Sequence, residues 1–431
     1  MNHLEDRFFN FKEPQLSGKT FCILFLLFYQ VTVFRANAVP ELTGIHETAM
    51  NGKSDTVRTS EPVLQKDIMD VIRNVRKRKN ADSTKVSEEP MPGKVLYSVV
   101  PAVGYTLSTG FTGIISANAA LYLSNPASTN ISSISSSFNY TQYNQIMVPV
   151  LANIWTKNNG YNIVIDWRFF KYPQNTYGLG GHSVEINADN IDYQHLRLHQ
   201  SVLKRVGNAF YAGLGYFMDY RWRISEYDSN SDVTQYGLTR TSMSSGMIAT
   251  LSYDSRKNSI NPEKGLFANI QYRPNMTLLG SNTNWQSLTV DIRKYIHFPA
   301  GSRNVLALWN YNWLTLSGKP PYLDLPSTGW DPFNNTGRGY IQGRFRSPNM
   351  LYLESEYRFE LTRNGLLGGV VFANAQSFSN WPALKYDRIA PATGLGLRIK
   401  VNKTSRTNIA VDYGFGLNGS RGLFVNLGEV F

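Results

Sequence analysis

The fold class is indicated most clearly by the segment LYLESEYRFEL, residues 351–361. Its odd positions are Leu, Leu, Ser, Tyr, Phe and Leu, whereas its even positions are Tyr, Glu, Glu, Arg and Glu. Side chains that alternate with a period of two indicate a β-strand with one apolar and one charged face. Strands of soluble sandwiches average about 5–6 residues. A strand of about ten residues with a charged face therefore favours a membrane barrel with a polar lumen.

The same alternation recurs on both sides of this segment, for example over residues 395–401 and 409–415. It predicts an all-β protein, a transmembrane antiparallel β-barrel of about sixteen strands over residues 94–431. A closed barrel suits lipid because every backbone donor and acceptor is paired internally. An even strand count places both ends of the barrel on the periplasmic side. The expected strands are 95–107, 110–124, 131–143, 145–156, 160–172, 189–204, 208–225, 236–253, 265–277, 284–297, 303–317, 347–362, 365–378, 389–402, 406–417 and 421–431.

The composition agrees with this class. Charged residues make up 17% of the 431 residues, against roughly 25% in an average soluble domain. Aromatic residues make up 13%, as expected where aromatic girdles flank an apolar band. The formal net charge is +12, but the basic residues are scattered apart from one run at 76–79. This distribution does not favour a nucleic-acid partner.

Residues 1–38 are expected to be a cleaved signal peptide that exports the protein to a bacterial outer membrane. The mostly apolar run of residues 21–34 precedes Ala36-Asn37-Ala38, which has the small-x-small pattern of a cleavage site. This run is shorter than the about 20 residues that a transmembrane helix needs. Cys22, the only cysteine, lies within this segment. We therefore expect the exported protein to contain neither a thiol nor a disulfide.

Residues 39–93 are polar and basic and lack strand periodicity. Apolar residues between 68 and 75 recur at helical spacing, directly ahead of the basic run at 76–79. This pattern fits a short amphipathic helix on an anionic lipid surface. It equally fits a solvated linker, which is the interpretation that we favour for most of the segment.

A long connection rich in Pro and Gly spans residues 318–346. Connections of more than about 12–15 residues without structure of their own are usually functional or disordered. Near its end, Gly337-Arg338-Gly339-Tyr340 places one cation between two glycines, which allow the backbone to bend tightly. A cation on such a loop either stays in water or enters the barrel and pairs with a carboxylate.

Four motifs also follow one another in the second half of the chain. They are YDSRKN at 253–258 with Pro262 and KGL at 264–266, RGY at 338–340, NML at 349–351 with EYRF at 356–359, and LGEVF at 427–431. In this order they resemble the strand–turn motif, the arginine-bearing loop, the following strand and the terminal strand of one family. That family is the BamA/TamA-type outer-membrane assembly superfamily, also called the bacterial surface antigens. The resemblance covers roughly residues 94–431.

This resemblance implies that the loop between the eleventh and twelfth strands folds inward and is locked there. Arg338, flanked by Gly339 and Tyr340, would enter the lumen and pair with acids on the next two strands. Glu356 matches the first partner of Arg338. Asn374 stands at the second position, where the family usually has Asp, and a charge-assisted hydrogen bond remains open to it.

The resemblance also implies a weak seam between the first strand and the last, through which protein clients pass. The terminal strand is expected to end in an aromatic residue at the membrane interface. Its marker residues are Leu423, Val425, Leu427 and Phe431. Residues 39–93 cannot hold even one ordinary POTRA module, the periplasmic domain through which such proteins receive clients. We therefore expect a variant of the family without these domains.

The expected function is assistance in the insertion, assembly or translocation of proteins at the outer membrane. The expected partners are outer-membrane lipid and client barrel proteins or other envelope proteins. The alternative is a passive diffusion channel or a structural barrel within an envelope complex.

An enzyme is not expected, because the sequence has no Gly-x-Ser-x-Gly or His-Glu-x-x-His motif. We likewise expect no cofactor and no metal. His195 and His199 would lie about 13 Å apart along a strand, too far for one metal ion, and are expected to line the lumen.

Overall fold

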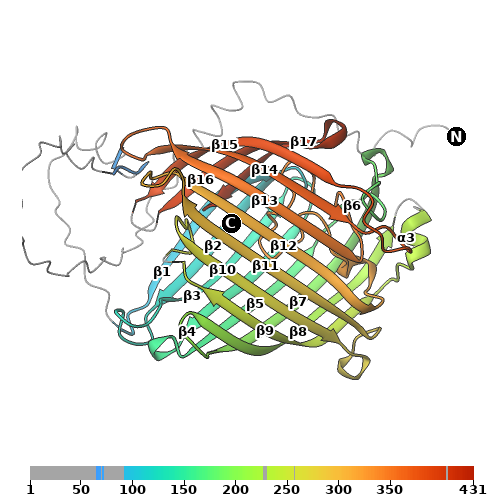
Figure 1. The fold of residues 1–431 in the computed structure, drawn as a ribbon. Helices are drawn as coiled ribbons and strands as arrows, with labels where there is room; N and C mark the ends of the chain where they lie inside the picture. The colour runs from blue at the N-terminus through green and yellow to red at the C-terminus, as the bar shows by residue number, and fades with distance from the viewer. Residues whose placement is uncertain (1–64, 69, 72–91, 227–230, 257, 404–405) are drawn as a thin grey trace, which may run out of the picture.

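The computed structural model describes residues 65–68, 70–71, 92–226, 231–256, 258–403 and 406–431. These residues form an antiparallel β-barrel whose long strands run obliquely around it (Figure 1). The expected signal peptide and most of the polar segment before residue 92 lie outside the described residues, so both stay predictions. No helix in the described ranges is long and apolar enough to cross a membrane.

Sixteen long strands follow one another, with the three-residue strand β6 between the fifth and the sixth of them. The strands are β1 Leu96–Thr106, β2 Gly110–Leu121, β3 Ser132–Thr141, β4 Ile146–Trp155, β5 Tyr161–Lys171, β6 Gln174–Thr176, β7 Asp189–Arg205, β8 Phe210–Glu226, β9 Ser242–Asp254, β10 Gly265–Asn275, β11 Trp285–His297, β12 Val305–Gly318, β13 Asn349–Glu360, β14 Leu367–Phe378, β15 Ala390–Asn402, β16 Thr407–Phe415 and β17 Arg421–Leu427. The connections contain the short helix α3 Ser231–Tyr236 and the 3-10 turns η2 Lys157–Asn159, η3 Glu185–Asn187, η4 Thr277–Leu279, η5 Tyr322–Asp324 and η6 Leu417–Gly419.

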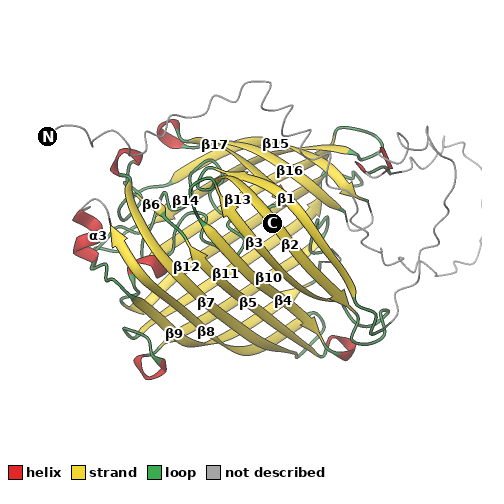
Figure 2. Ribbon diagram, turned by 180° about the vertical axis from the view of Figure 1, so that it is seen from behind, coloured by secondary structure: helices red, strands yellow, loops and turns green. Residues whose placement is uncertain are grey.

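The long strands pair antiparallel with their neighbours in sequence, from β1–β2 through β5–β7 to β16–β17 (Figures 1 and 2). The short strand β6 continues β5 in one register along β7, and Pro173 separates the two strands. Proline has no amide hydrogen to donate to the ladder. β1 also lies beside β17, where Gly422 faces Leu107. The predicted fold class and the count of sixteen long strands are confirmed.

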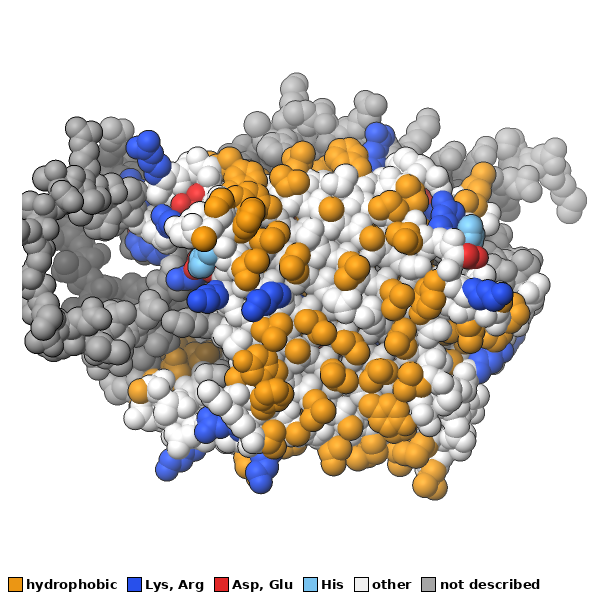
Figure 3. All heavy atoms as spheres, in the orientation of Figure 1, with side chains coloured by type: hydrophobic (Ala, Val, Ile, Leu, Met, Phe, Trp, Pro, Cys, Tyr) orange, Lys and Arg blue, Asp and Glu red, His pale blue; other side chains and the backbone are white. Residues whose placement is uncertain are grey.

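Side chains alternate between the outside and the lumen, as the period of two predicts. In β13, Leu351 and Leu353 are exposed, whereas Glu354, Glu356 and Arg358 are buried. On the face seen in Figure 3, hydrophobic side chains cover the middle of the wall and charged side chains gather toward its ends. This distribution matches a wall that faces lipid.

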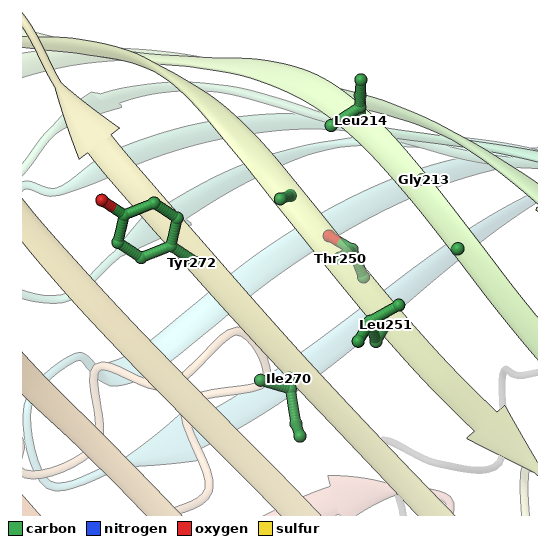
Figure 4. A pocket seen from close by; sticks show the side chains of 8 residues that line it. Gly213, Leu214, Thr250, Leu251, Ile270 and Tyr272 are labelled. Carbon is green, nitrogen blue, oxygen red and sulfur yellow. The ribbon is translucent and has the colours of Figure 1, made fainter.

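The outer wall has a shallow apolar hollow across β8, β9 and β10 (Figure 4). Small side chains there leave space between the exposed side chains of Leu214 and Leu251. The hollow opens on the outer face of the wall, so it belongs to the surface that meets lipid. Its lining residues are Ala212, Gly213, Leu214, Ala249, Thr250, Leu251, Ile270 and Tyr272.

Most strand boundaries lie within three residues of the sequence expectation, and two differ by more. β9 begins at Ser242 rather than near residue 236, because residues 231–236 form α3. β17 ends at Leu427 rather than at the last residue of the sequence. The expectation of a terminal strand that runs to residue 431 is therefore wrong.

The four residues after β17, 428–431, turn into the lumen and are called the inward tail below. Gly428 adopts a φ of +99°, a conformation that glycine reaches at little cost. Phe431 is buried and packs on Trp309 with ring centroids 5.1 Å apart. The aromatic ring expected at the membrane interface thus lies inside the barrel, because the glycine turn directs the chain inward and an aromatic surface receives the ring.

A described part of the N-terminal segment, residues 65–68 and 70–71, touches the turns at one end of the barrel. Asp67 accepts a hydrogen bond of 2.8 Å from the main-chain amide of Asp70. Lys403, in the β15–β16 turn, donates its amide to Asp67 at 3.0 Å and its ammonium to Asp70 at 2.8 Å. This contact attaches the segment to the end of the barrel that the strand count assigns to the periplasm.

Candidate functional site

The connection between β12 and β13, residues 319–348, lies inside the barrel and is called the lumen loop below. Most of its residues are buried, among them Tyr322, Tyr340 and Phe345. Its aromatic residues pack against side chains of the wall. For example, the rings of Phe345 and Phe378 have centroids 5.7 Å apart. The eleventh and twelfth long strands are β12 and β13, so the inward-folding loop lies where the sequence placed it.

Arg338 is the main polar contact between the lumen loop and the wall. Its side chain is 2% exposed and pairs with three carboxylates, those of Glu354, Glu356 and Asp412. The Nε atom donates to Glu354 at 3.0 Å, and Nη1 donates to Asp412 at 2.5 Å. The guanidinium also lies over the ring of Phe372, 3.8 Å from its centroid. Such charge-assisted bonds are stronger than neutral ones and restrict the geometry.

The charge of Arg338 is firmly maintained in this position. Burial alone would lower the pKa of Arg338, but Glu354, Glu356 and Asp412 outweigh it and raise the pKa well above its ordinary value. A buried charge is tolerated where partners of opposite sign replace its water. The guanidinium therefore holds together carboxylates from two strands, β13 and β16.

Glycines on both sides of Arg338 make this approach possible. Gly337 and Gly339 have φ values of +79° and +106°, which residues with a Cβ rarely adopt. A Cβ on Gly339 would lie 2.8 Å from the Cβ of Ala392. Tyr340 follows and donates its hydroxyl to the carbonyl of Pro391 at 2.6 Å. The turn is thus shaped to place Arg338 against the wall.

Asn374 contacts the loop in a different way from the sequence expectation. Its amide donates to the main-chain carbonyl of Arg338 at 2.9 Å and does not contact the guanidinium. It therefore positions the turn rather than balancing its charge. The second and third acidic partners are Glu354 and Asp412.

The sequence analysis missed Glu354 and Asp412, although a sequence signal existed for both. Glu354 is on the same inward face as Glu356, two residues away on β13. Asp412 is the only charged residue in the alternating segment 409–415. An inward carboxylate on either strand is a candidate partner for a cation inside the barrel.

A second anchor of the lumen loop has the opposite charge. Asp324 accepts a hydrogen bond of 2.6 Å from Arg221 on β8 and another of 2.6 Å from the hydroxyl of Ser244 on β9. All three side chains are buried. The loop therefore presents an acid to a basic part of the wall and, fourteen residues later, a base to an acidic part.

His195 and His199 also face the lumen, as expected. Each places its Nε2 atom against a different oxygen of Asp219, at 2.9 and 2.8 Å. Arg197 and Arg273 contact the same carboxylate, at 3.1 and 3.0 Å. This group of residues is an internally paired network in the wall, which gives no reason to assign a metal ion to it.

The predicted seam residues lie on or after β17. Leu423, Val425 and Leu427 pair with Tyr413, Val411 and Ile409 of β16, respectively. Leu427 is exposed on the outer face, whereas Phe431 is buried in the lumen. The seam residues of the sequence analysis thus divide into an outward set on the strand and one inward residue in the tail.

Taken together, these features define a membrane β-barrel whose lumen contains its own loop, held by a buried arginine. A family profile described as the Omp85 superfamily domain matches residues 127–422. The chain belongs to the Omp85 superfamily, a family of outer-membrane proteins whose members insert or translocate proteins. The family resemblance found in the sequence is confirmed.

Solved structures with a similar fold include the following three. BamA from Haemophilus ducreyi lacking POTRA domains 1–3 matches with a TM-score of 0.54 and 14% identity, over 77% of this chain and 70% of that chain. CdiB from Acinetobacter baumannii matches with a TM-score of 0.52 and 13% identity, over 78% and 60%. CdiB from Escherichia coli matches with a TM-score of 0.51 and 11% identity, over 78% and 64%.

The chain spans less than two thirds of the length of either CdiB chain. Identities this low show a shared fold and no more. No curated protein matches the sequence.

Proposed function

We propose that this protein assists the insertion, assembly or translocation of proteins at the outer membrane, and that the lumen loop held by Arg338 controls this activity. Membership of the Omp85 superfamily supports the general role. The observation that carries the proposal is the contact of one loop arginine with carboxylates on β13 and β16. Both strands lie in the last quarter of the chain, where β16 pairs directly with β17 at the seam and β13 lies three strands before β16.

In this proposal the loop has a positioning role. It keeps β13 and β16 in a fixed relation while clients meet the edge of the sheet at the seam. A client that passes through the lumen would instead require the loop to leave. A buried loop inside the barrel supports the assembly role over a stable diffusion channel, since a porin needs a continuous aqueous path.

Depletion of the protein, followed by quantitative analysis of the outer-membrane proteome, tests this function. Wild type should restore the client proteins, whereas the double variant Arg338→Ala Glu356→Ala should not. Arg240→Ala is a matched control, because this exposed arginine lies in the connection between β8 and β9, away from Arg338 and its carboxylate partners. An unchanged proteome with a loss of small-solute uptake would instead favour a channel.

A further inference from the structure

The inward tail and the lumen loop meet in one network of charges. Arg358 donates to Glu356 at 2.7 Å and to the main-chain oxygen of Phe431 at 2.9 Å. The carboxylate of Glu356 is also a partner of Arg338. A single acid on β13 thus connects the loop arginine with the arginine that holds the tail.

A second path connects the same two segments. Arg398 on β15 donates to Asp412 at 2.5 Å and to Glu429 of the tail at 2.7 Å. Asp412 is the carboxylate that accepts from Nη1 of Arg338. The tail also receives a hydrogen bond directly from the loop, because the side-chain amide of Asn335 donates to the main-chain carbonyl of Val430 at 2.6 Å.

The charges of this network nearly balance. It contains three arginines and four carboxylates, all buried or nearly so. Its members are Arg338, Arg358, Arg398, Glu354, Glu356, Asp412 and Glu429. Loss of one cation would leave two positive charges against four negative ones in a site that excludes water. Because buried networks respond as a unit, a change at the loop is expected to reach the tail.

We propose that residues 428–431 form a latch that holds the end of the last strand inside the barrel, and that the lumen loop controls this latch through Glu356 and Asp412. β17 runs antiparallel to β1, with Gly422 near Leu107 at one end. A released tail would straighten and extend β17 toward the start of β1. The latch thus sets how much of β1 the last strand can pair with. This inference rests on the proposed role of the seam in protein assembly.

Thiol labelling of Val430→Cys, in a Cys22→Ser background, measures release of the latch. Val430 is 2% exposed, so labelling by a maleimide should be slow in the refolded barrel with wild-type network residues. Glu429→Gln removes the tail carboxylate, and Arg338→Ala changes only the loop. Each should increase the labelling rate by about tenfold or more, because a lost hydrogen bond to a charged group costs about 1.5–3 kcal/mol.

Two matched controls lie outside the network. Glu360→Gln affects the ion pair of 2.9 Å with Arg303, and Arg344→Ala affects the loop through its contacts with Ser183. Both should leave the labelling rate near that of wild type. Heat-modifiable mobility on a gel confirms that each variant is folded before its rate is compared.

The proposal would be overturned if Arg338→Ala labelled as slowly as Arg344→Ala in folded protein, or if Glu429→Gln left the rate unchanged. No client protein takes part in this assay. The two proposals can therefore fail separately. If depletion left the outer-membrane proteome intact while Arg338→Ala still increased labelling, the assembly role would be refuted and the latch would stand.

Discussion

Replacement of Arg338 by alanine is the most direct perturbation of the site. The guanidinium is 2% exposed and has three carboxylate partners. Its removal leaves these acids close together without their shared cation. Breaking a buried ion pair by removing one partner costs about 3–5 kcal/mol. The stacking on Phe372 is lost as well, so we expect a loss of unfolding free energy in the upper part of this range.

Arg344→Ala is the matched comparison, because Arg344 is a buried arginine of the same loop. It donates to the hydroxyl and the carbonyl of Ser183, at 2.9 and 2.7 Å. Its nearest carboxylate, Glu185 at 3.5 Å, is 52% exposed. No buried acid is left without its cation when Arg344 is removed. The expected cost is therefore about 1–2 kcal/mol.

Urea unfolding of the refolded barrel, followed by tryptophan fluorescence, measures the two free energies. Limited proteolysis of the lumen loop in the folded barrel provides a local measurement. Arg338→Ala should unfold at clearly lower urea concentration and expose the loop to protease. Equal midpoints and equal cleavage for the two variants would show that the loop is held by its packing alone, and the lock would be refuted.

Two further variants, a conductance measurement and a pH series test the remaining contacts. Asp324→Asn should weaken the second anchor and cost about 1.5–3 kcal/mol, while Asp324→Asn combined with Arg221→Leu should recover part of this loss in urea unfolding. Asn374→Leu removes the donor to the Arg338 carbonyl and should increase cleavage of the loop with little change in global stability. In planar bilayers, Arg338→Ala should raise the frequency of open conductance steps, and traces like those of wild type would argue that the loop stays in place without its cation. Burial would raise the pKa of Glu429, but Arg398 and Arg358 lower it below the ordinary value of 4.5. Its stabilising effect is therefore complete above pH 4.5 and is lost as the pH falls through the lower folded value. The labelling rate of Val430→Cys, divided by that of free cysteine at the same pH, should stay low at neutral pH and rise only in acid, because the thiolate fraction itself falls with pH.

The strands of this barrel could be predicted because lipid and lumen impose opposite demands on alternate residues. The segments 351–361 and 395–401 carry this pattern strongly enough to set both register and face. The position of Arg338 inside the barrel followed from a family resemblance, and Glu354 was available from the same alternation. Sequence alone predicted the framework and one end of the lock.

The remaining contacts depend on distances that no local pattern encodes. Asp324 and Arg221 are 103 residues apart in sequence, and each is an unremarkable charged residue in its own segment. Asn374 could donate or accept, and only the approach of the loop backbone decides which. The inward turn at Gly428 requires a specific backbone conformation and a receiving surface that includes Trp309, which lies in a distant strand.

The two anchors of the lumen loop also have a mechanical consequence. β8 is the seventh of the sixteen long strands and β16 is the fifteenth, so the two lie eight positions apart, on opposite sides of the barrel. Asp324 joins the loop to β8, and Arg338 joins it to β16. A segment attached to opposite sides of a barrel limits how far the barrel can flatten or widen. The loop thereby restricts the elliptical deformation of the cross-section, and release of either end would permit the whole wall to change shape.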